Sequence, residues 1–104
     1  MNLENPKQEV RSESPTVRRI RAHLAKDHVG VWAAAKDEFV TNLLGGDDLG
    51  VVNLVARRYL EDHYILFLAE VCYQGCVIAK NKDRANEIRN FYHLPLYQKR
   101  PANQ

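Results

Sequence analysis

Six consecutive residues, Tyr64–Ala69 (YILFLA), leave this chain few ways to fold. A helix whose side chains are apolar on every side has no face that it can turn toward water, so we expect this turn to be covered from all directions. The same residues would tolerate a strand, but the apolar positions around them recur at helical spacing. Those positions are Val52, Ala56, Leu60, Tyr64, Phe67, Val71 and Ile78. The sequence therefore predicts one long central helix over residues 48–79.

The length of the chain, 104 residues, is that of a single domain with one hydrophobic core. A domain this small has little surface with which to surround an apolar turn, and a second copy can supply the missing cover. We therefore expect a homodimer that forms through the apolar faces of the long helices. The predicted dimer or partner interface consists of aromatic and large aliphatic side chains. They are Tyr64, Phe67, Leu68, Val71, Phe91, Tyr92 and Tyr97.

The first helical segment is expected to begin after Ser14, whose side chain can accept a backbone N–H, with Pro15 in the first turn. The pair Gly45-Gly46 should end it, because glycine adopts the left-handed C-cap conformation at little cost. Gly30 predicts a break or kink near residues 28–31, and the pattern leaves open whether residues 15–44 form one bent helix or two. Its predicted buried face comprises Val17, Ile20, Leu24, Val31, Ala35, Phe39 and Leu43.

Two further boundaries follow from capping residues. Asp47 or Asp48 should cap the central helix, because an aspartate accepts an unpaired N–H and its charge suits the helix N-terminus. A last short helix should start at Asn81 or Lys82 and end at about Tyr92, before Leu94-Pro95, because the residue that precedes a proline avoids helical dihedral angles.

The ends of the chain lack hydrophobic periodicity. We predict that residues 1–14 form a disordered tail and residues 98–104 a flexible one, because segments that bury little apolar surface do not offset the entropy of ordering. The predicted fold is accordingly an all-α domain of three to four helices over residues 15–97, with a long central helix and paired as a helical homodimer.

The histidines and carboxylates do not form a metal or catalytic motif. Glu61, Asp62, His63, Glu70 and His28 are the nearest approach to one. No carboxylate precedes a histidine by three residues, which is the spacing of di-iron sites in helical bundles. We expect no metal, no cofactor, no small-molecule substrate and no enzymatic activity. A metal-dependent enzyme is the rival class, and elemental analysis of the purified protein would detect it.

Cys72 and Cys76 are the only cysteines, and on a helix they lie one turn apart on the same face. A disulfide between them would strain an intact helix, and two thiols are half of a zinc site. We interpret them as small apolar side chains of the core.

Basic residues cluster although the formal net charge is only +2. Residues 16–30 carry a local charge of +3 and residues 80–93 one of +2, whereas residues 31–56 carry −3. If the first and last helices pack on the same side, their basic residues could neutralise phosphates of a nucleic acid. The candidates for this alternative are Arg18, Arg19, Arg21, Lys26, Arg57, Arg58, Lys82, Arg84 and Arg89.

The sequence contains no apolar run long enough for a membrane span, and its N-terminus lacks the apolar core of a secretory signal. We therefore expect an intracellular, cytoplasmic protein without a membrane partner. The favoured function is that of a small, non-enzymatic regulatory or adaptor protein that binds another macromolecule, with a protein partner preferred. Binding of nucleic acid by the dimer is the alternative.

Overall fold

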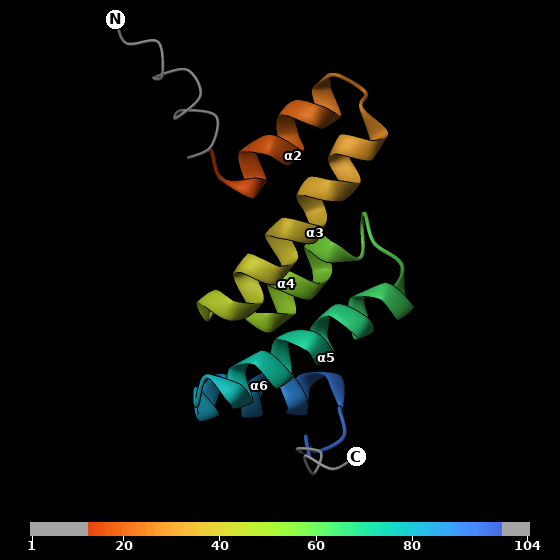
Figure 1. Cartoon of the computed structure of the whole chain (residues 1–104). Coiled ribbons are helices and arrows are strands. Elements are labelled where there is room, and N and C mark those ends of the chain that lie inside the picture. Colours follow the sequence, from red (N-terminus) through yellow and green to blue (C-terminus); the bar gives the residue numbers. More distant parts are fainter. Residues whose placement is uncertain (1–12, 99–104) are drawn as a thin grey trace, which may run out of the picture.

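A computed structural model describes residues 13–98 of the chain, and within this range it contains five helices and no strand (Figure 1). The helices are α2 (Pro15–Leu24), α3 (His28–Gly45), α4 (Leu49–Ala56), α5 (Asp62–Ile78) and α6 (Lys82–Tyr92). The predicted all-α class is confirmed, but the described part has more helices than the three to four expected. The predicted tails fall almost entirely on residues 1–12 and 99–104, which lie outside the described residues.

The first segment is two helices, which settles the question that the sequence left open. The chain turns back at residues 25–27, where Lys26 has a positive φ of 58° and the side chain of Asp27 accepts the N–H of Gly30 at 3.0 Å. The predicted break is thus present, but it lies at residues 25–27 and not at 28–31, and Gly30 forms no kink because it lies inside the first turn of α3. A Cβ at Gly30 would collide with the Asp27 carboxylate, so the missing side chain makes room for the cap.

The predicted boundaries at the glycine pair and at the later caps are confirmed. Gly46 ends α3 in the left-handed conformation, with φ 89°. Asp48 caps α4 by accepting the N–H of Val51 at 3.1 Å, and Asn81 caps α6 by accepting that of Arg84 at 3.4 Å.

The predicted single helix over residues 48–79 is wrong, because the chain leaves the helical path between Ala56 and Asp62. Backbone hydrogen bonds from Tyr59 and Leu60 to the Ala56 carbonyl close a turn there. The turn buries Leu60, of which 4% is exposed, and so lets α4 and α5 both contribute to one core.

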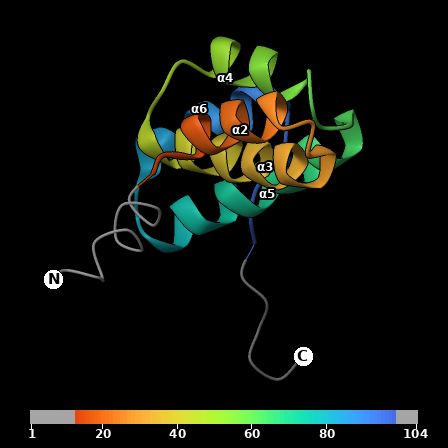
Figure 2. The ribbon, with the colours of Figure 1, turned by 90° about the horizontal axis from the view of Figure 1, so that it is seen from above.

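The core lies among α3, α4, α5 and α6, and its largest fully buried side chains are Phe39, Leu43 and Ile88. Helix α2 packs mainly on α3, and none of its residues is buried. Helix α5 lies along one margin of the helical body (Figure 2) and turns one face toward the core. The buried residues of that face are Ile65, Leu68, Ala69, Cys72, Tyr73 and Cys76.

The apolar turn at residues 64–69 is covered by its own chain on one side only. Ile65, Leu68 and Ala69 are buried, whereas Leu66 is 45% exposed and Phe67 58% exposed. The single chain therefore leaves one flank of this turn exposed, and the predicted cover from every direction stays a prediction that depends on a second copy. The exposed flank of α5 is apolar, with Leu66 and Phe67 both in contact with solvent.

Candidate interaction surfaces

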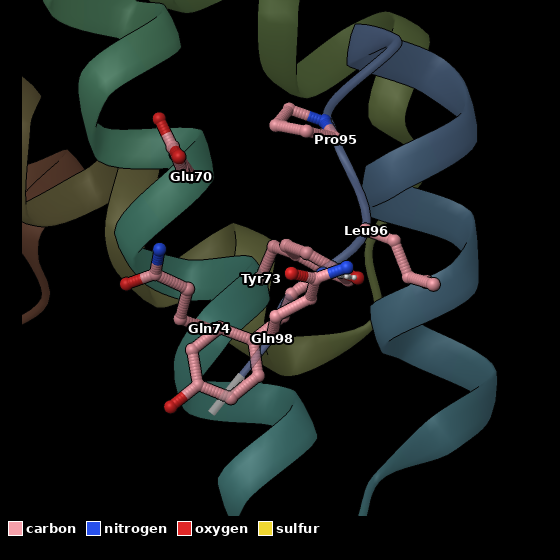
Figure 3. A pocket seen from close by; sticks show the side chains of 7 residues that line it. Glu70, Tyr73, Gln74, Pro95, Leu96 and Gln98 are labelled. Carbon is pink, nitrogen blue, oxygen red and sulfur yellow. Dashed lines mark hydrogen bonds between the residues drawn. The ribbon is translucent and has the colours of Figure 1, made fainter. Parts of the chain in front are cut away.

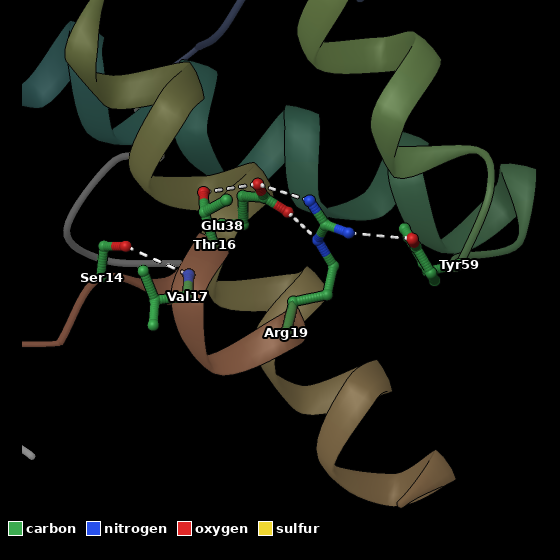
Figure 4. A network of polar contacts seen from close by, with 6 residues as sticks. All are labelled: Ser14, Thr16, Val17, Arg19, Glu38 and Tyr59. Carbon is green, nitrogen blue, oxygen red and sulfur yellow. Dashed lines mark hydrogen bonds and ion pairs between the residues drawn. The ribbon is translucent and has the colours of Figure 1, made fainter. Parts of the chain in front are cut away.

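A buried carboxylate fastens α2 to α3 (Figure 4). Glu38 of α3 is 7% exposed, and its oxygens accept hydrogen bonds from Arg19 Nε at 2.7 Å, Arg19 Nη2 at 3.3 Å and Thr16 Oγ1 at 2.7 Å. Arg19 Nη1 donates to the hydroxyl of Tyr59 at 2.9 Å, so the contact also reaches the turn before α5. The hydrogen bonds to Glu38 raise the pKa of Arg19, against the effect of burial. We call these four residues the Glu38 clasp.

The clasp determines which side of α2 faces the solvent. A buried carboxylate has to be paired, and the side chains that pair it, Thr16 and Arg19, lie on the polar side of α2. The apolar side therefore points outward, with Val17 43% exposed, Ile20 48% and Leu24 77%. The predicted burial of these three positions is wrong, although their counterparts in α3, Ala35, Phe39 and Leu43, are buried as expected.

A second apolar surface runs along the outer side of α5. Phe67 is 58% exposed, Val71 49% and Ile78 69%. Tyr64 stacks on Phe67 with ring centroids 6.2 Å apart, and Trp32 of α3 stacks on Tyr64 at 5.5 Å. Three aromatic rings, one from α3 and two from α5, thus lie next to one another along this surface.

The structure brings together only some of the predicted interface residues. Tyr64, Phe67 and Val71 share the outer side of α5, whereas Leu68 belongs to the core. The others lie on α6 and the segment after it. Phe91 is 41% exposed, and Tyr92 and Tyr97 are half-buried against the core.

Tyr92 is engaged inside its own chain. Its hydroxyl donates to Asn53 Oδ1 of α4 at 2.9 Å, and its ring meets that of Phe39 edge to face, with centroids 6.5 Å apart. Burial, with a smaller contribution from Cys72, raises the pKa of Tyr92 to about 12.

Most of the candidate phosphate-binding arginines already have partners. Arg18 pairs with Asp37 at 3.2 Å, Arg57 with Asp62 at 3.5 Å, and Arg21 with Glu13. Arg19 belongs to the Glu38 clasp. Helices α2 and α6 lie toward opposite ends of the described structure (Figure 1), so their basic residues do not merge into the single patch that the alternative requires. Lys26, Arg58 and Lys82 are exposed, and Arg89 is half-buried.

Arg84, another of these candidates, is 6% exposed and completes the C-terminal end of α3. Its Nε donates to the Leu43 carbonyl at 2.6 Å, and its Nη2 donates to the carbonyls of Asn42 at 3.1 Å and Asp47 at 2.8 Å. Nη1 pairs with Glu87 at 2.8 Å. The last carbonyls of a helix have no partner within it, and a planar guanidinium can serve several of them together. This role was not predicted from the sequence.

A pocket of about 420 Å³ lies between α5 and the segment after α6 (Figure 3). Glu70, Tyr73 and Gln74 line it from α5, and residues 95–98 close the other side. The hydroxyl of Tyr73 accepts the backbone N–H of Tyr97 at 2.9 Å, so it holds the segment in place. The carboxylate of Glu70 and the side-chain amides of Gln74 and Gln98 place hydrogen-bonding groups around the pocket.

Cys72 and Cys76 are free thiols buried in the core, as the sequence indicated. Burial raises the pKa of Cys72 to about 11, and it also raises the pKa of Cys76. Among the described residues, no group of three or more histidine, cysteine, aspartate or glutamate side chains is placed to hold a metal ion.

Comparisons of the chain with profiles of protein families, with curated proteins and with solved structures find no match. None of the helices within residues 13–98 is long and apolar enough to cross a membrane. Exposed apolar surfaces on α2 and on α5 are the candidate interaction surfaces.

Proposed function

We propose that this protein is a small, non-enzymatic adaptor or regulator, that it acts as a homodimer, and that it binds a partner protein through the apolar side of α2. One observation carries the partner-binding role: α2 packs with its polar side inward and presents Val17, Ile20 and Leu24 to the solvent. These residues stand at positions i, i+3 and i+7, which is the spacing with which an amphipathic helix contacts another helix.

The orientation of α2 keeps its apolar side available to a partner protein. A helix of 10 residues is too short to be stable alone, yet the Glu38 clasp holds α2 in place without using its apolar side. The binding surface is therefore formed before the partner arrives, which reduces the entropy lost on association. Full burial of an exposed leucine or isoleucine contributes about 1.5 to 3 kcal/mol, so three such side chains can supply useful affinity.

The charges on α2 indicate the chemistry of the partner. The helix carries Arg18, Arg19 and Arg21 and no acidic residue, and the side chain of Arg21 is 65% exposed. Lys26 follows in the exposed turn. Complementary charges orient the two sides of an interface and speed their encounter. Because all three arginines are paired with carboxylates of the chain, the cation beside this surface without a partner of that kind is Lys26. The partner that fits is an amphipathic helix with apolar anchors and an acidic residue that can reach Lys26.

Nucleic acid fits this surface less well. Affinity for a polyanion comes from free cations, and four of the five candidate arginines outside α6 are paired with carboxylates. A side of α2 centred on three aliphatic residues adds little to phosphate binding. Protein is therefore the preferred partner, and binding of a nucleic acid is an outcome that the experiment can detect.

The experiment compares three forms of the full chain as affinity baits in an extract of the source cells. They are the unmodified protein, the double variant Ile20→Glu/Leu24→Glu, and the control Leu54→Glu, which changes a residue of α4 that is 64% exposed. Each protein that the unmodified chain retains is then produced separately and titrated by calorimetry. We expect the double variant to bind at least about tenfold more weakly than the other two forms, which corresponds to a loss of about 1.4 kcal/mol.

Equal binding by all three forms would overturn the role of α2. A separate titration with labelled DNA and RNA duplexes at low salt tests the alternative. Tight binding that is lost in Arg21→Ala/Lys26→Ala, while Ile20→Glu/Leu24→Glu still binds, would replace a protein partner by a nucleic acid.

A further inference from the structure

The turn between α2 and α3 holds one residue in a disfavoured conformation. Residues 25–27 form this turn and are exposed, and Lys26 has a φ of 58°. A residue with a side chain is strained in this left-handed region, because its Cβ comes too close to the following carbonyl oxygen. The turn contains neither glycine nor proline, and alanine and lysine both favour a helix. The strain would therefore be relieved if residues 25–27 continued the helix.

The apolar pattern runs through this turn in the register of one helix. Val17 and Ala35 stand 18 residues apart, which is about five helical turns, so a continuous helix would point both in the same direction. Leu24 and Val31 would lie within about 40° of that direction. A short, strained turn between two segments that can also form one helix is the kind of hinge through which identical chains exchange an element.

The contacts that hold α2 on α3 can be made equally well by the α2 of a second copy. Helix α2 buries no residue of its own, and its hydrogen bonds with the rest of the chain join Thr16 and Arg19 to Glu38 and Arg18 to Asp37 (Figure 4). These bonds connect residues that are far apart in the sequence, so they do not depend on the turn. The surface of α3 that α2 covers therefore fits one occupant in particular, an α2 helix of this same sequence.

The pairing of α2 with α3 is compatible with twofold symmetry. The two helices form a hairpin (Figure 1) in which Arg18 pairs with Asp37, so the midpoint of the pairing falls at residues 27–28. Two straight helices that cross there in opposite directions bring residues 16–19 of each copy beside residues 37–38 of the other. Every contact of the hairpin is then made twice, once on each side of the axis.

The sides of α2 and α3 that meet in the hairpin would also share one side of a straight helix. Thr16, Gly30 and Asp37 stand at multiples of seven residues from one another, and so do Arg19 and Ala33. All five border the seam between α2 and α3. A repeat of seven residues with a step of three inside it is the spacing with which two helices pack along their length. The exchange therefore uses a surface that already exists and requires only that the turn straighten.

We propose that two copies of this chain dimerise by exchanging α2, so that residues 15–45 of each copy form one continuous helix and Thr16 and Arg19 of each copy complete the Glu38 clasp of the other. This inference specifies how the homodimer of the proposed function is built and rests on that dimer. The apolar side of α2 still points outward, because α2 contacts α3 with the same polar side in both forms. One dimer thus presents two copies of the α2 surface to partner proteins.

The first test measures association by sedimentation equilibrium, after incubation at a raised temperature that lets the turn open and close. Lys26→Gly and Lys26→Ala remove the same charge and form a matched pair. Glycine tolerates the positive φ of the hairpin and is poor inside a helix, whereas alanine has the opposite preferences. The dissociation constant of the dimer should therefore be at least about tenfold higher for Lys26→Gly than for Lys26→Ala. Equal constants would overturn the exchange, and a monomeric unmodified chain at every concentration would overturn the dimer with it.

The second test identifies the chain from which each α2 comes. Arg18→Cys/Asp37→Cys replaces an ion pair across the seam whose side chains are 38% and 44% exposed, and a short bismaleimide can join the two new thiols. In a hairpin both thiols belong to one chain, whereas after exchange they belong to two. On a denaturing gel we expect a covalent dimer, and mainly a product within one chain when Lys26→Gly is added. The unmodified chain controls for reaction at Cys72 and Cys76, and Arg18→Cys alone controls for random collisions.

The two tests separate failure of the exchange from failure of the dimer. If the unmodified chain is a dimer but the double-cysteine variant is joined only within single chains, the exchange of α2 is wrong while the dimer stands, as for a dimer that forms through α5. The binding measurements on the Ile20→Glu/Leu24→Glu variant report on the apolar side of α2, so they remain valid in either case.

Discussion

The guanidinium of Arg19 and the carboxylate of Glu38 meet side by side, with Nε–Oε1 at 2.7 Å and Nη2–Oε2 at 3.3 Å, at a place where Glu38 is almost removed from water. Two such parallel bonds fix the direction of the guanidinium as well as its distance. The pair therefore sets the rotation of α2 about its axis. Through that rotation it exposes the apolar residues of α2.

The substitution Glu38→Ala should release α2 while the other helices stay folded, because α2 buries no residue of its own. Removal of one member of a buried ion pair costs about 3 kcal/mol, which corresponds to roughly a hundredfold increase in the population in which α2 is detached from α3. Native-state hydrogen exchange should show lost protection for the amides of residues 15–24 and retained protection in α5. Asp37→Ala removes the exposed pair with Arg18 and should cost less than about 1 kcal/mol. Similar exchange in the two variants would contradict the importance of the clasp.

The substitution Arg84→Met should destabilise the whole domain, because the backbone carbonyls of Leu43 and Asp47 would lose the donor that Arg84 supplies, whereas the carbonyl of Asn42 keeps backbone N–H donors. Each unsatisfied buried group costs about 1 to 3 kcal/mol, so a total loss of about 3 kcal/mol is expected in urea unfolding. Arg84→Lys should recover only part of it, since an ammonium cannot reproduce the planar fork. The exposed Arg58→Met is the comparison, and a loss there as large as at Arg84 would count against the capping role.

The two cysteines should be almost inert in the native protein. Burial raises the pKa of Cys72 from 9.0 to about 11 and also raises that of Cys76, and only the thiolate reacts quickly with disulfide reagents. With Ellman's reagent at pH 8, we expect negligible colour from the folded protein and two equivalents after unfolding in guanidinium. Rapid reaction of one thiol in the folded state would show that it is accessible.

Stability should fall as the pH rises from 10 toward 12. The pKa of Tyr92 is raised from 10.0 to about 12 in the folded protein, so above pH 10 the phenol ionises in the unfolded chain before it ionises in the folded one. This contribution is fully present below pH 10 and is lost as the pH passes through the folded value. Thermal midpoints measured across this range should decline less steeply for Tyr92→Phe than for the unmodified chain. Equal slopes for the two proteins would rule out Tyr92 as the source.

The helix boundaries that depend on nearby residues could be predicted from the sequence, and those that depend on distant contacts could not. Ser14, Asp48 and Asn81 each accept the N–H three residues further along, so the signal lies within one turn. The break between α4 and α5 contains neither glycine nor proline. Its cause is the burial of Leu60, which the periodicity of one helix does not reveal.

The same distinction applies to the candidate surfaces. The spacing of Val17, Ile20 and Leu24 correctly indicates one apolar side of a helix. The prediction that these side chains are buried is wrong, because the spacing does not show whether that side faces the core or the solvent. The side that faces α3 was decided by Glu38, which lies 19 residues away from Arg19 in the chain. For α5, the sequence correctly placed Tyr64, Phe67 and Val71 on one side, and only the structure showed which of them its own chain covers.

Arg84 has a consequence for how this protein is made. The carbonyls of Leu43 and Asp47 receive a hydrogen bond from a residue that stands 41 and 37 positions later in the chain. While the polypeptide emerges from the ribosome, these carbonyls therefore stay hydrogen-bonded to water until residue 84, near the end of the domain, has been synthesised. Folding of the domain should accordingly be completed late, after translation has passed α6, and a nascent chain that stops before residue 84 should remain sensitive to proteases in the loop after α3.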